Sequence, residues 1–209
     1  MSFVRSLLTA SVALTFLAAP ARADLEQLGP NYFVAGVRSG EFDFFAAPLQ
    51  EGRQRQQNWC WAATVQMVLN YHGLRVSQEA VVARIFGALV DRPGDPAQIL
   101  EALSGWAPDV RGRFSQIYAT PYVMRGSEIV QDLAHKWPLI VGLRQPNAQI
   151  GHAYVLTAVF YSVGPGNEPV FDKVVLRDPW PTNESRIELG WNEFRARTQF
   201  MARVSVQRL

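Results

Sequence analysis

The feature that most constrains this 209-residue chain is its single cysteine, Cys60. A lone thiol forms no intramolecular disulfide, so the fold depends on a hydrophobic core. Hydrophobic residues make up 48% of the chain, including six Trp and twelve Phe, and this composition fits a globular domain. Cys60 lies in the run Asn58-Trp59-Cys60-Trp61-Ala62-Ala63, where we expect an apolar helix to begin.

The first 23 residues have the features of a secretory signal peptide. Arg5 provides a positive charge, Leu7 to Ala19 are largely apolar, and Ala21-Arg22-Ala23 forms a small-residue cleavage site. The apolar stretch is shorter than the roughly 20 residues that cross a bilayer. We therefore expect cleavage before Asp24 and a periplasmic or secreted protein without a membrane anchor. A free thiol in an exported protein is open to oxidation, so its presence calls for a functional reason.

Charge argues against a nucleic-acid partner. Loss of the signal peptide would remove two arginines and no acids, so the 20 basic residues fall to 18, against 18 Asp and Glu. The mature chain would then be formally neutral and lack the basic surface that phosphate backbones attract. Removing 23 of 209 residues leaves 186, enough for one domain with a substantial core.

Hydrophobic periodicity predicts helices first and strands afterwards. We expect helices over Cys60–Tyr71 with a left-handed cap at Gly73, over about 78–88 after Ser77, from Asp95-Pro96 to near Gly105, and from Ser127 to about Lys136. We expect strands over 138–143, 152–161, 170–178 and 200–206. We interpret residues 24–50 as an N-terminal arm or edge strands, with a possible role as a pro-segment. This order of elements predicts an α+β fold.

Cys60 is the candidate nucleophile. The N-terminus of a helix presents unpaired N–H groups and the positive end of the helix dipole, and both stabilise a thiolate. The chain has three histidines to act as a base. His72 and His135 fall in the last turns of predicted helices, where a structural role is the better interpretation. His152 begins a predicted strand after Gly151, so a rigid element would hold its ring, and we predict that it is the base.

An acceptor should orient the imidazole of His152. Asp178 ends the next predicted strand, and an antiparallel pair would bring it beside His152. Asp172 is the competing carboxylate, but it lies near the opposite end of that strand. A tetrahedral intermediate would also need hydrogen-bond donors.

Two donors are available near the nucleophile: the backbone N–H of Cys60 and an upstream side-chain amide. We favour Gln54 for the amide, six residues before Cys60. Gln56 and Gln57 are rivals that spacing alone does not separate from it.

Together these residues resemble a known family. Gln54, the run Trp59–Ala63, Pro138–Leu143, Gly151-His152-Ala153 and Asp178-Pro179-Trp180-Pro181 are similar to the bacterial papain-like cysteine peptidases. The similarity is strongest to the group that contains plant-pathogen effector cysteine proteases and more distant to the bacteriocin-leader peptidases. It covers roughly residues 50–182. It implies a papain-like catalytic domain over 51–209, with a helical half that carries the nucleophile helix packed on an antiparallel sheet half.

The resemblance also implies roles. Cys60 matches the nucleophile, His152 the general acid/base, Asp178 the orienting group and Gln54 the oxyanion donor. It implies hydrolysis of a peptide or protein substrate without a metal or other cofactor. An acyltransferase or amidase on the same scaffold, and an inactive papain-like binding module, remain alternatives.

Three tryptophans are candidates for the walls of a substrate pocket. They are Trp59, Trp61 and Trp180, which flank the candidate nucleophile and orienting group. Tryptophans are also common in protein cores, so the same residues could serve packing alone.

Overall fold

The computed structural model describes residues 25–108, 114–122, 125–145 and 151–208. The predicted signal peptide, residues 1–23, lies outside the described residues. The helices are α1 (Ser39–Ala46), α2 (Cys60–Tyr71), α3 (Gln78–Phe86), α4 (Pro96–Leu103), α5 (Gly126–Ala134) and α6 (Trp191–Arg197). The strands are β1 (Leu25–Gly29), β2 (Tyr32–Gly36), β3 (Gly105–Pro108), β4 (Phe114–Pro121), β5 (Leu139–Leu143), β6 (His152–Val163), β7 (Pro169–Arg177), β8 (Arg186–Gly190) and β9 (Thr198–Arg208).

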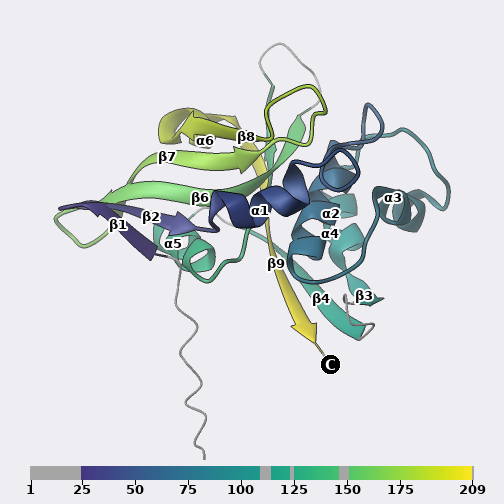
Figure 1. Ribbon diagram of the computed structural model, residues 1–209, viewed down its shortest axis with the longest axis horizontal. Helices are drawn as coiled ribbons and strands as arrows, with labels where there is room; N and C mark the ends of the chain where they lie inside the picture. The colour runs from purple at the N-terminus through teal and green to yellow at the C-terminus, as the bar shows by residue number, and fades with distance from the viewer. Residues whose placement is uncertain (1–24, 109–113, 123–124, 146–150, 209) are drawn as a thin grey trace, which may run out of the picture.

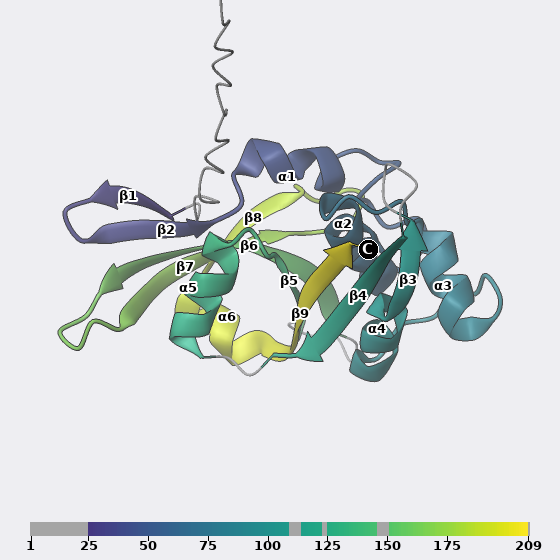
Figure 2. The ribbon, with the colours of Figure 1, turned by 90° about the horizontal axis from the view of Figure 1, so that it is seen from below.

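Within the described residues, nine strands form one antiparallel sheet centred on β6. One edge of β6 pairs with β7, and β8 continues the sheet beyond it. On its other edge, the first half of β6 pairs with β5 and the second half with β2. The sheet then continues through β9, β4 and β3 on the β5 side, and Figure 2 shows these strands curling away from β6 and β7.

Two hydrophobic cores lie on opposite faces of the central strands. Helices α2, α3 and α4 cover one face and form the helical half of the molecule (Figure 1), whereas α5 and α6 cover the other. Successive residues of β6 divide between the cores, with Val155 in the first and Leu156 in the second. This alternation follows from the two-residue period of a strand. A strand buried on both faces gives its first residue, His152, a rigid support.

Helix α2 is the centre of the helical half. It is buried on all sides from Trp61 to Leu69, so tertiary packing rather than solvent exposure decides its orientation. The predicted bounds of this helix are confirmed, and Gly73 follows it with a φ of 90°, in the left-handed range.

The other predicted helices and strands are confirmed within a few residues. Ser77 caps α3 by accepting a hydrogen bond from the Ala80 N–H, and Asp95 forms a capping box with Gln98 at the start of α4. Helices α3 and α4 end at Phe86 and Leu103, slightly earlier than expected, and α5 begins at Gly126. The α+β fold class, with a helical half on an antiparallel sheet, is confirmed.

The order of elements is less simple than the sequence predicted. The hairpin β1–β2 lies in the segment where we expected an arm or edge strands, whereas the pair β3–β4 separates α4 from α5. Residues 24–50 also contain α1, although we interpreted this segment as an extended arm or edge strands. The aromatic run Phe42-Asp43-Phe44-Phe45 favours a strand by propensity. Tertiary contacts override that preference.

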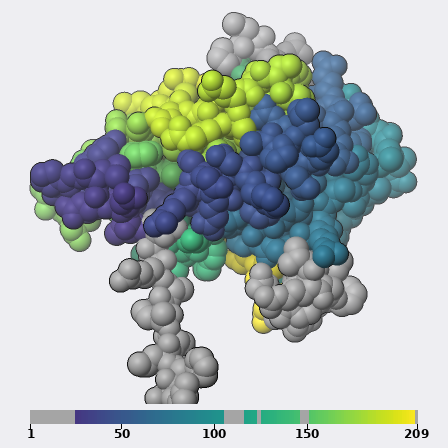
Figure 3. Space-filling view, in the orientation of Figure 1, coloured from purple at the N-terminus to yellow at the C-terminus, as the bar shows by residue number. Residues whose placement is uncertain are grey.

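Helix α1 is held by contacts from distant parts of the chain. Phe42 is fully buried and packs against Tyr71 of α2, with ring centroids 5.2 Å apart. Arg177 of β7 is fully buried, pairs with Asp43, and donates to the Ser39 carbonyl. Figure 3 shows α1 lying between the purple hairpin β1–β2 and the helical half. These contacts connect the N-terminal segment to both halves of the protein.

We expect Phe42→Ala to lower the free energy of unfolding by about 3–5 kcal/mol, because it leaves a cavity in the core. Phe44 lies in the same helix and is 71% exposed, so Phe44→Ala is the matched control. That variant should change stability by no more than about 0.5 kcal/mol. Urea unfolding of both variants measures the difference. Equal effects would contradict the packing of α1 described above.

Candidate active site

A cavity of about 560 Å³ opens between the helical half and the sheet. Cys60 from α2 and His152 from β6 line it together, with Trp61, Phe200 and Trp180 among its apolar walls. Several neutral amide side chains also line the cavity: Gln57, Asn58, Gln145, Asn183 and Gln199. The two candidate reactive side chains therefore meet at a concave surface, although 92 residues separate them in the sequence.

Cys60 is the first residue of α2 and is partly buried. The tryptophans on either side anchor this end of the helix. Trp59 donates its indole N–H to the Val90 carbonyl at 2.8 Å, and Trp61 donates to the Arg92 carbonyl at 3.1 Å. The N-cap residue is Trp59, whose side chain has no acceptor for the N–H groups of the first turn. These groups are therefore not occupied by a side-chain cap and can stabilise a negative charge on sulfur.

The three candidate tryptophans take different positions. Trp61 and Trp180 line the cavity, and their role as walls of a substrate pocket stays a prediction. Trp59 is not among the lining residues, and it is 4% exposed within the first hydrophobic core. The position of Trp61 depends on Gly94, where an added Cβ would come within 2.6 Å of the indole ring. The sequence did not single out this glycine.

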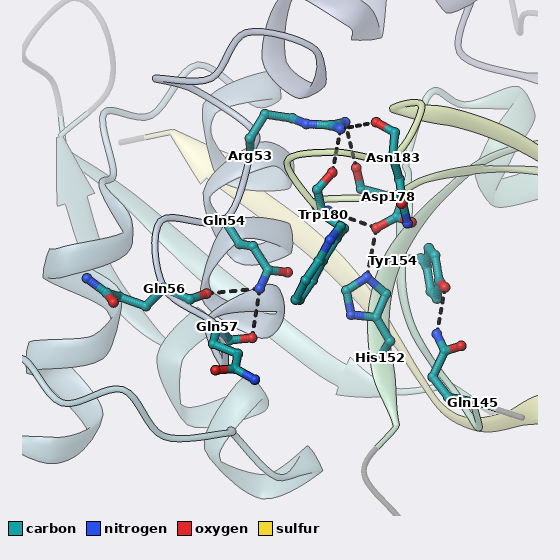
Figure 4. A network of polar contacts seen from close by, with 10 residues as sticks. All are labelled: Arg53, Gln54, Gln56, Gln57, Gln145, His152, Tyr154, Asp178, Trp180 and Asn183. Carbon is teal, nitrogen blue, oxygen red and sulfur yellow. Dashed lines mark hydrogen bonds and ion pairs between the residues drawn. The ribbon is translucent and has the colours of Figure 1, made fainter. Parts of the chain in front are cut away.

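His152 and Asp178 are brought together by the pairing of β6 and β7. His152 begins β6, and Asp178 follows the last residue of β7, so both lie at the same end of the antiparallel pair. The His152 Nε2 atom lies 2.7 Å from Asp178 Oδ1 (Figure 4). This bond engages Nε2, so Nδ1 is the ring nitrogen left for the cysteine. The two side chains are only 12% and 4% exposed.

Aromatic rings shield this hydrogen bond from water. The Tyr154 ring meets the imidazole edge to face, with centroids 4.6 Å apart, and the Trp180 ring lies 6.3 Å away. Gln145 donates a hydrogen bond to the Tyr154 hydroxyl at 2.8 Å. A low local dielectric strengthens the attraction between His152 and Asp178.

The Asp178 carboxylate accepts two further hydrogen bonds. Its Oδ1 accepts from the Trp180 backbone N–H, and its Oδ2 from the Asn183 side-chain amide, each at 2.8 Å. Burial alone would raise the pKa of Asp178, but the bonds from His152, Asn183 and Trp180 outweigh burial and lower it. Asp178 is therefore ionised at neutral pH. Asn183 was not singled out by the sequence, because a lone Asn in a turn is common.

The electrostatics of His152 favour its protonated form. Burial by itself would lower the pKa of the imidazole, but hydrogen bonds with Asp178 and with the Cys60 sulfur, together with negative charge on both groups, raise it to about 9. An imidazolium beside Cys60 is thus stable at neutral pH. The arrangement can hold the proton of the thiol on His152, which is the charge distribution that a cysteine nucleophile requires.

The competing residues lie away from the cavity. Asp172 accepts a hydrogen bond from the Tyr32 hydroxyl at 2.5 Å, near the far end of β7. His72 and His135 occupy the C-caps of α2 and α5, as expected of structural residues. The structure therefore brings only His152, of the three histidines, to the wall of the cavity that Cys60 lines.

Gln54 lies in the loop before α2 and is 5% exposed. Its side-chain amide donates to the carbonyls of Gln56 at 2.9 Å and Gln57 at 2.8 Å (Figure 4). Its buried Oε1 finds no hydrogen-bond partner among the described residues. Both N–H groups of the amide are thus engaged by their own loop, and an oxyanion contact would require one of them to be shared or released. The oxyanion role of Gln54 stays a prediction.

The rivals of Gln54 differ in position. The Gln56 side chain is exposed and points away from His152 in Figure 4, whereas Gln57 is one of the residues that line the cavity. In the part of the chain that the structure describes, no group of three or more His, Cys, Asp or Glu side chains could hold a metal ion. Of the helices described, none is long and apolar enough to cross a membrane.

The fold is similar to that of the papain-like cysteine peptidases. The chain belongs to the Peptidase C39-like family, which matches residues 50–206. The resemblance expected from the sequence is thereby confirmed at the level of the papain-like cysteine peptidases. No curated protein sequence matches the chain.

The solved structures that are similar to this chain include the following two. One is proCathepsin B S9 from Trypanosoma congolense, with a TM-score of 0.53 and 10% identity, covering 84% of this chain and 77% of that one. The other is a double glycine motif protease from an AMS/PCAT transporter, solved with its leader peptide, with a TM-score of 0.47 and 16% identity. That match covers 75% of this chain and 89% of the other. At these identities the likeness to cathepsin B concerns the fold.

We expect the pH dependence of Cys60 alkylation to report the state of His152. Because the pKa of His152 is raised to about 9, the imidazolium persists at neutral pH and is lost only as the pH rises through that value. Iodoacetamide should therefore modify Cys60 readily at about pH 6, where an ordinary thiol of pKa about 8.5 is only about 0.3% ionised. Mass spectrometry of the 209-residue chain, which has one cysteine, gives the rate directly.

Two variants test the origin of this behaviour. His152→Ala should slow alkylation at about pH 6 by roughly 10-fold or more, because no imidazolium remains to stabilise the thiolate. Asp178→Asn should move the loss of the imidazolium to lower pH, because the carboxylate charge and its hydrogen bond no longer raise the pKa of His152. A rate at about pH 6 unchanged in both variants would contradict the coupling of the three side chains.

Proposed function

We propose that this protein is a peptidase that hydrolyses peptide bonds through Cys60, His152 and Asp178. The observation that carries the proposal is the buried 2.7 Å hydrogen bond from His152 to Asp178, on the wall of the cavity that Cys60 lines. Membership of a peptidase family supports the same chemistry.

In the proposed acylation step, the Cys60 sulfur attacks the carbonyl carbon of the scissile bond. The carbonyl oxygen gains negative charge, and the C–N bond then breaks to leave a thioester on Cys60. The proton held on His152 passes to the departing amine, which leaves as a neutral group. The ionised Asp178 keeps the ring in place and stabilises its charge before that transfer.

The second step releases the acyl group. His152, now neutral, accepts a proton from a water molecule, and the resulting hydroxide attacks the thioester carbonyl. The C–S bond breaks, the product leaves as a carboxylic acid, and Cys60 and His152 regain their starting state. An amine in place of water would give a new amide, so the same intermediate would also serve an acyltransferase.

The oxyanion of each tetrahedral intermediate needs donors in fixed positions. We propose the backbone N–H of Cys60, at the start of α2, and the side-chain amide of Gln54. Two observations support Gln54. It is buried in the loop that leads to Cys60. Its backbone N–H donates to the Pro179 carbonyl at 2.8 Å, and this bond holds Gln54 close to the loop that follows Asp178.

We further propose that the protein acts on peptides outside the cytoplasm after removal of residues 1–23. The support is the sequence of that segment, with its charged start, apolar centre and Ala-x-Ala site. N-terminal sequencing of protein recovered from the periplasm or medium checks this proposal, and a chain that still begins at Met1 would contradict it.

Incubation of the mature protein with a peptide library under reducing conditions tests the function. We expect cleavage by the wild-type protein and none above background with Cys60→Ala, because the nucleophile is absent. Cleavage shared equally by both proteins would exclude the mechanism. New amide linkages in place of free carboxylates would favour the acyltransferase. Rapid alkylation of Cys60 without turnover of any peptide would favour the inactive binding module.

Gln54→Ala should lower kcat by about 10- to 1,000-fold, with a smaller effect on KM, because a donor to the oxyanion acts in the transition state. Gln56→Ala is the matched control, since that side chain is exposed and should leave kcat within about 2-fold of wild type. Steady-state kinetics on a peptide identified in the library gives both values. A large loss of kcat in Gln56→Ala, with little loss in Gln54→Ala, would contradict the oxyanion role of Gln54.

A further inference from the structure

Arg53 is a buried cation next to the candidate site. It is 4% exposed and immediately precedes Gln54 in the loop that leads to α2. Its guanidinium donates to three backbone carbonyls: that of Asp178 at 2.9 Å, and those of Trp180 and Asn183 (Figure 4). A charged side chain that donates its hydrogen bonds to main-chain carbonyls fixes the conformation of the segment that carries those carbonyls.

Arg53 binds residues 178–183, and this segment provides the carboxylate that pairs with His152 and the groups that hold it. Asp178 provides the carboxylate, Trp180 donates its backbone N–H to that carboxylate, and Asn183 donates its amide to the other oxygen. The carbonyls of these same three residues are the ones that the guanidinium binds. Arg53 therefore binds the backbone carbonyls of Asp178, Trp180 and Asn183. These are the residues that provide the Asp178 carboxylate and hold it in position.

The main chain of Arg53 is fixed on its other side by the helical half. Gln78, at the start of α3, is fully buried and donates to the Arg53 carbonyl at 2.9 Å. Its Oε1 accepts from the Arg55 backbone N–H at 3.0 Å, and its amide also donates to Gln66 of α2 at 3.0 Å. Gln78 of α3, itself bonded to α2, thus holds the backbone of Arg53, and the Arg53 side chain reaches the loop after β7.

Arg53 consequently joins the part of the protein that carries Cys60 to the part that carries Asp178. We propose that Arg53 is a positioning residue, which fixes the 178–183 loop relative to α2 and so sets the Asp178 carboxylate, and through it the ring of His152, against Cys60. This inference rests on the proposed function only for its effect on turnover. Its effect on the reactivity of Cys60 is independent of the substrate.

The chemistry of arginine explains why this residue suits the task. The planar guanidinium presents five N–H groups in fixed directions, so one side chain can bind three carbonyls that diverge. Lysine would bring the same charge but a single point of attachment on a flexible stem. The positive charge also lies close enough to Asp178 for the two charges to attract each other.

The test compares Arg53→Ala and Arg53→Lys with the matched control Arg55→Ala. Arg55 is two residues away, and its exposed side chain pairs with Glu79, so it should not affect the site. We expect Arg53→Ala to slow Cys60 alkylation at about pH 6 by roughly 10-fold, because the imidazolium loses its fixed carboxylate. Arg53→Lys should lose several-fold, and Arg55→Ala should react like wild type.

Chemical rescue separates positioning from a merely structural role. Millimolar methylguanidinium should restore the alkylation rate of Arg53→Ala toward wild type by filling the vacated site, whereas sodium chloride at equal ionic strength should not. Circular dichroism and thermal unfolding show whether each variant is folded. If Arg53→Ala does not fold, the folded Arg53→Lys variant decides the question, and a wild-type alkylation rate in that variant would overturn the proposal.

Kinetics distinguishes the failure of this inference from failure of the proposed function. With a cleaved peptide, Arg53→Ala should lower kcat at least about 10-fold and change KM less than about 2-fold, since the ground-state contacts lie elsewhere. Wild-type kinetics and alkylation in folded Arg53→Ala would overturn the positioning role and leave the peptidase intact. Arg53-dependent alkylation in a protein that cleaves no peptide would support the positioning role and favour the inactive binding module over the peptidase.

Discussion

The hydrogen bond between His152 and Asp178 depends on the antiparallel pairing of β6 and β7, and the arrangement of the site depends on it in turn. Each residue supports the charge of the other. Burial by itself would lower the pKa of the imidazole and raise the pKa of the carboxylate. Together, with Tyr154 and Trp180 excluding water, the two side chains form a stable ionised pair. The bond thereby creates an imidazolium beside the single thiol.

The geometry of this pair requires support from both halves of the protein. β6 is buried on both faces and gives His152 a rigid base, while the all-round burial of α2 sets the position of Cys60. The loop after Asp178 has no regular structure of its own, and carbonyl contacts with Arg53 connect it to the helical half. The cavity lies between the helical half and the sheet, so its geometry depends on contacts that join the two. The Arg53 side chain reaches from the loop before α2 to the loop after Asp178 and is one such contact.

Local signals made much of the fold predictable. The caps at Ser77 and Asp95, the left-handed Gly73 and the periodicity of Cys60–Tyr71 act over a few residues, so a single sequence contains them in full. Helix α1 was missed because its aromatic residues favour strands locally, and its burial depends on Tyr71 and Arg177, which lie far along the chain. Local propensity contains no information about such partners.

By itself, the sequence determined which groups were available for chemistry: one thiol at a helix start, three histidines, and an aspartate at the end of a strand. The number of candidates was so small that position along the chain nearly sufficed to choose His152 and Asp178. Only the tertiary structure decided the partners that set their charges, namely Asn183, the Trp180 N–H group and the two aromatic rings. The tertiary structure also placed Trp59 in the first hydrophobic core, and Arg53 between the helical half and the loop after β7. These outcomes depend on contacts between distant segments, which form only when the helical half and the sheet pack together.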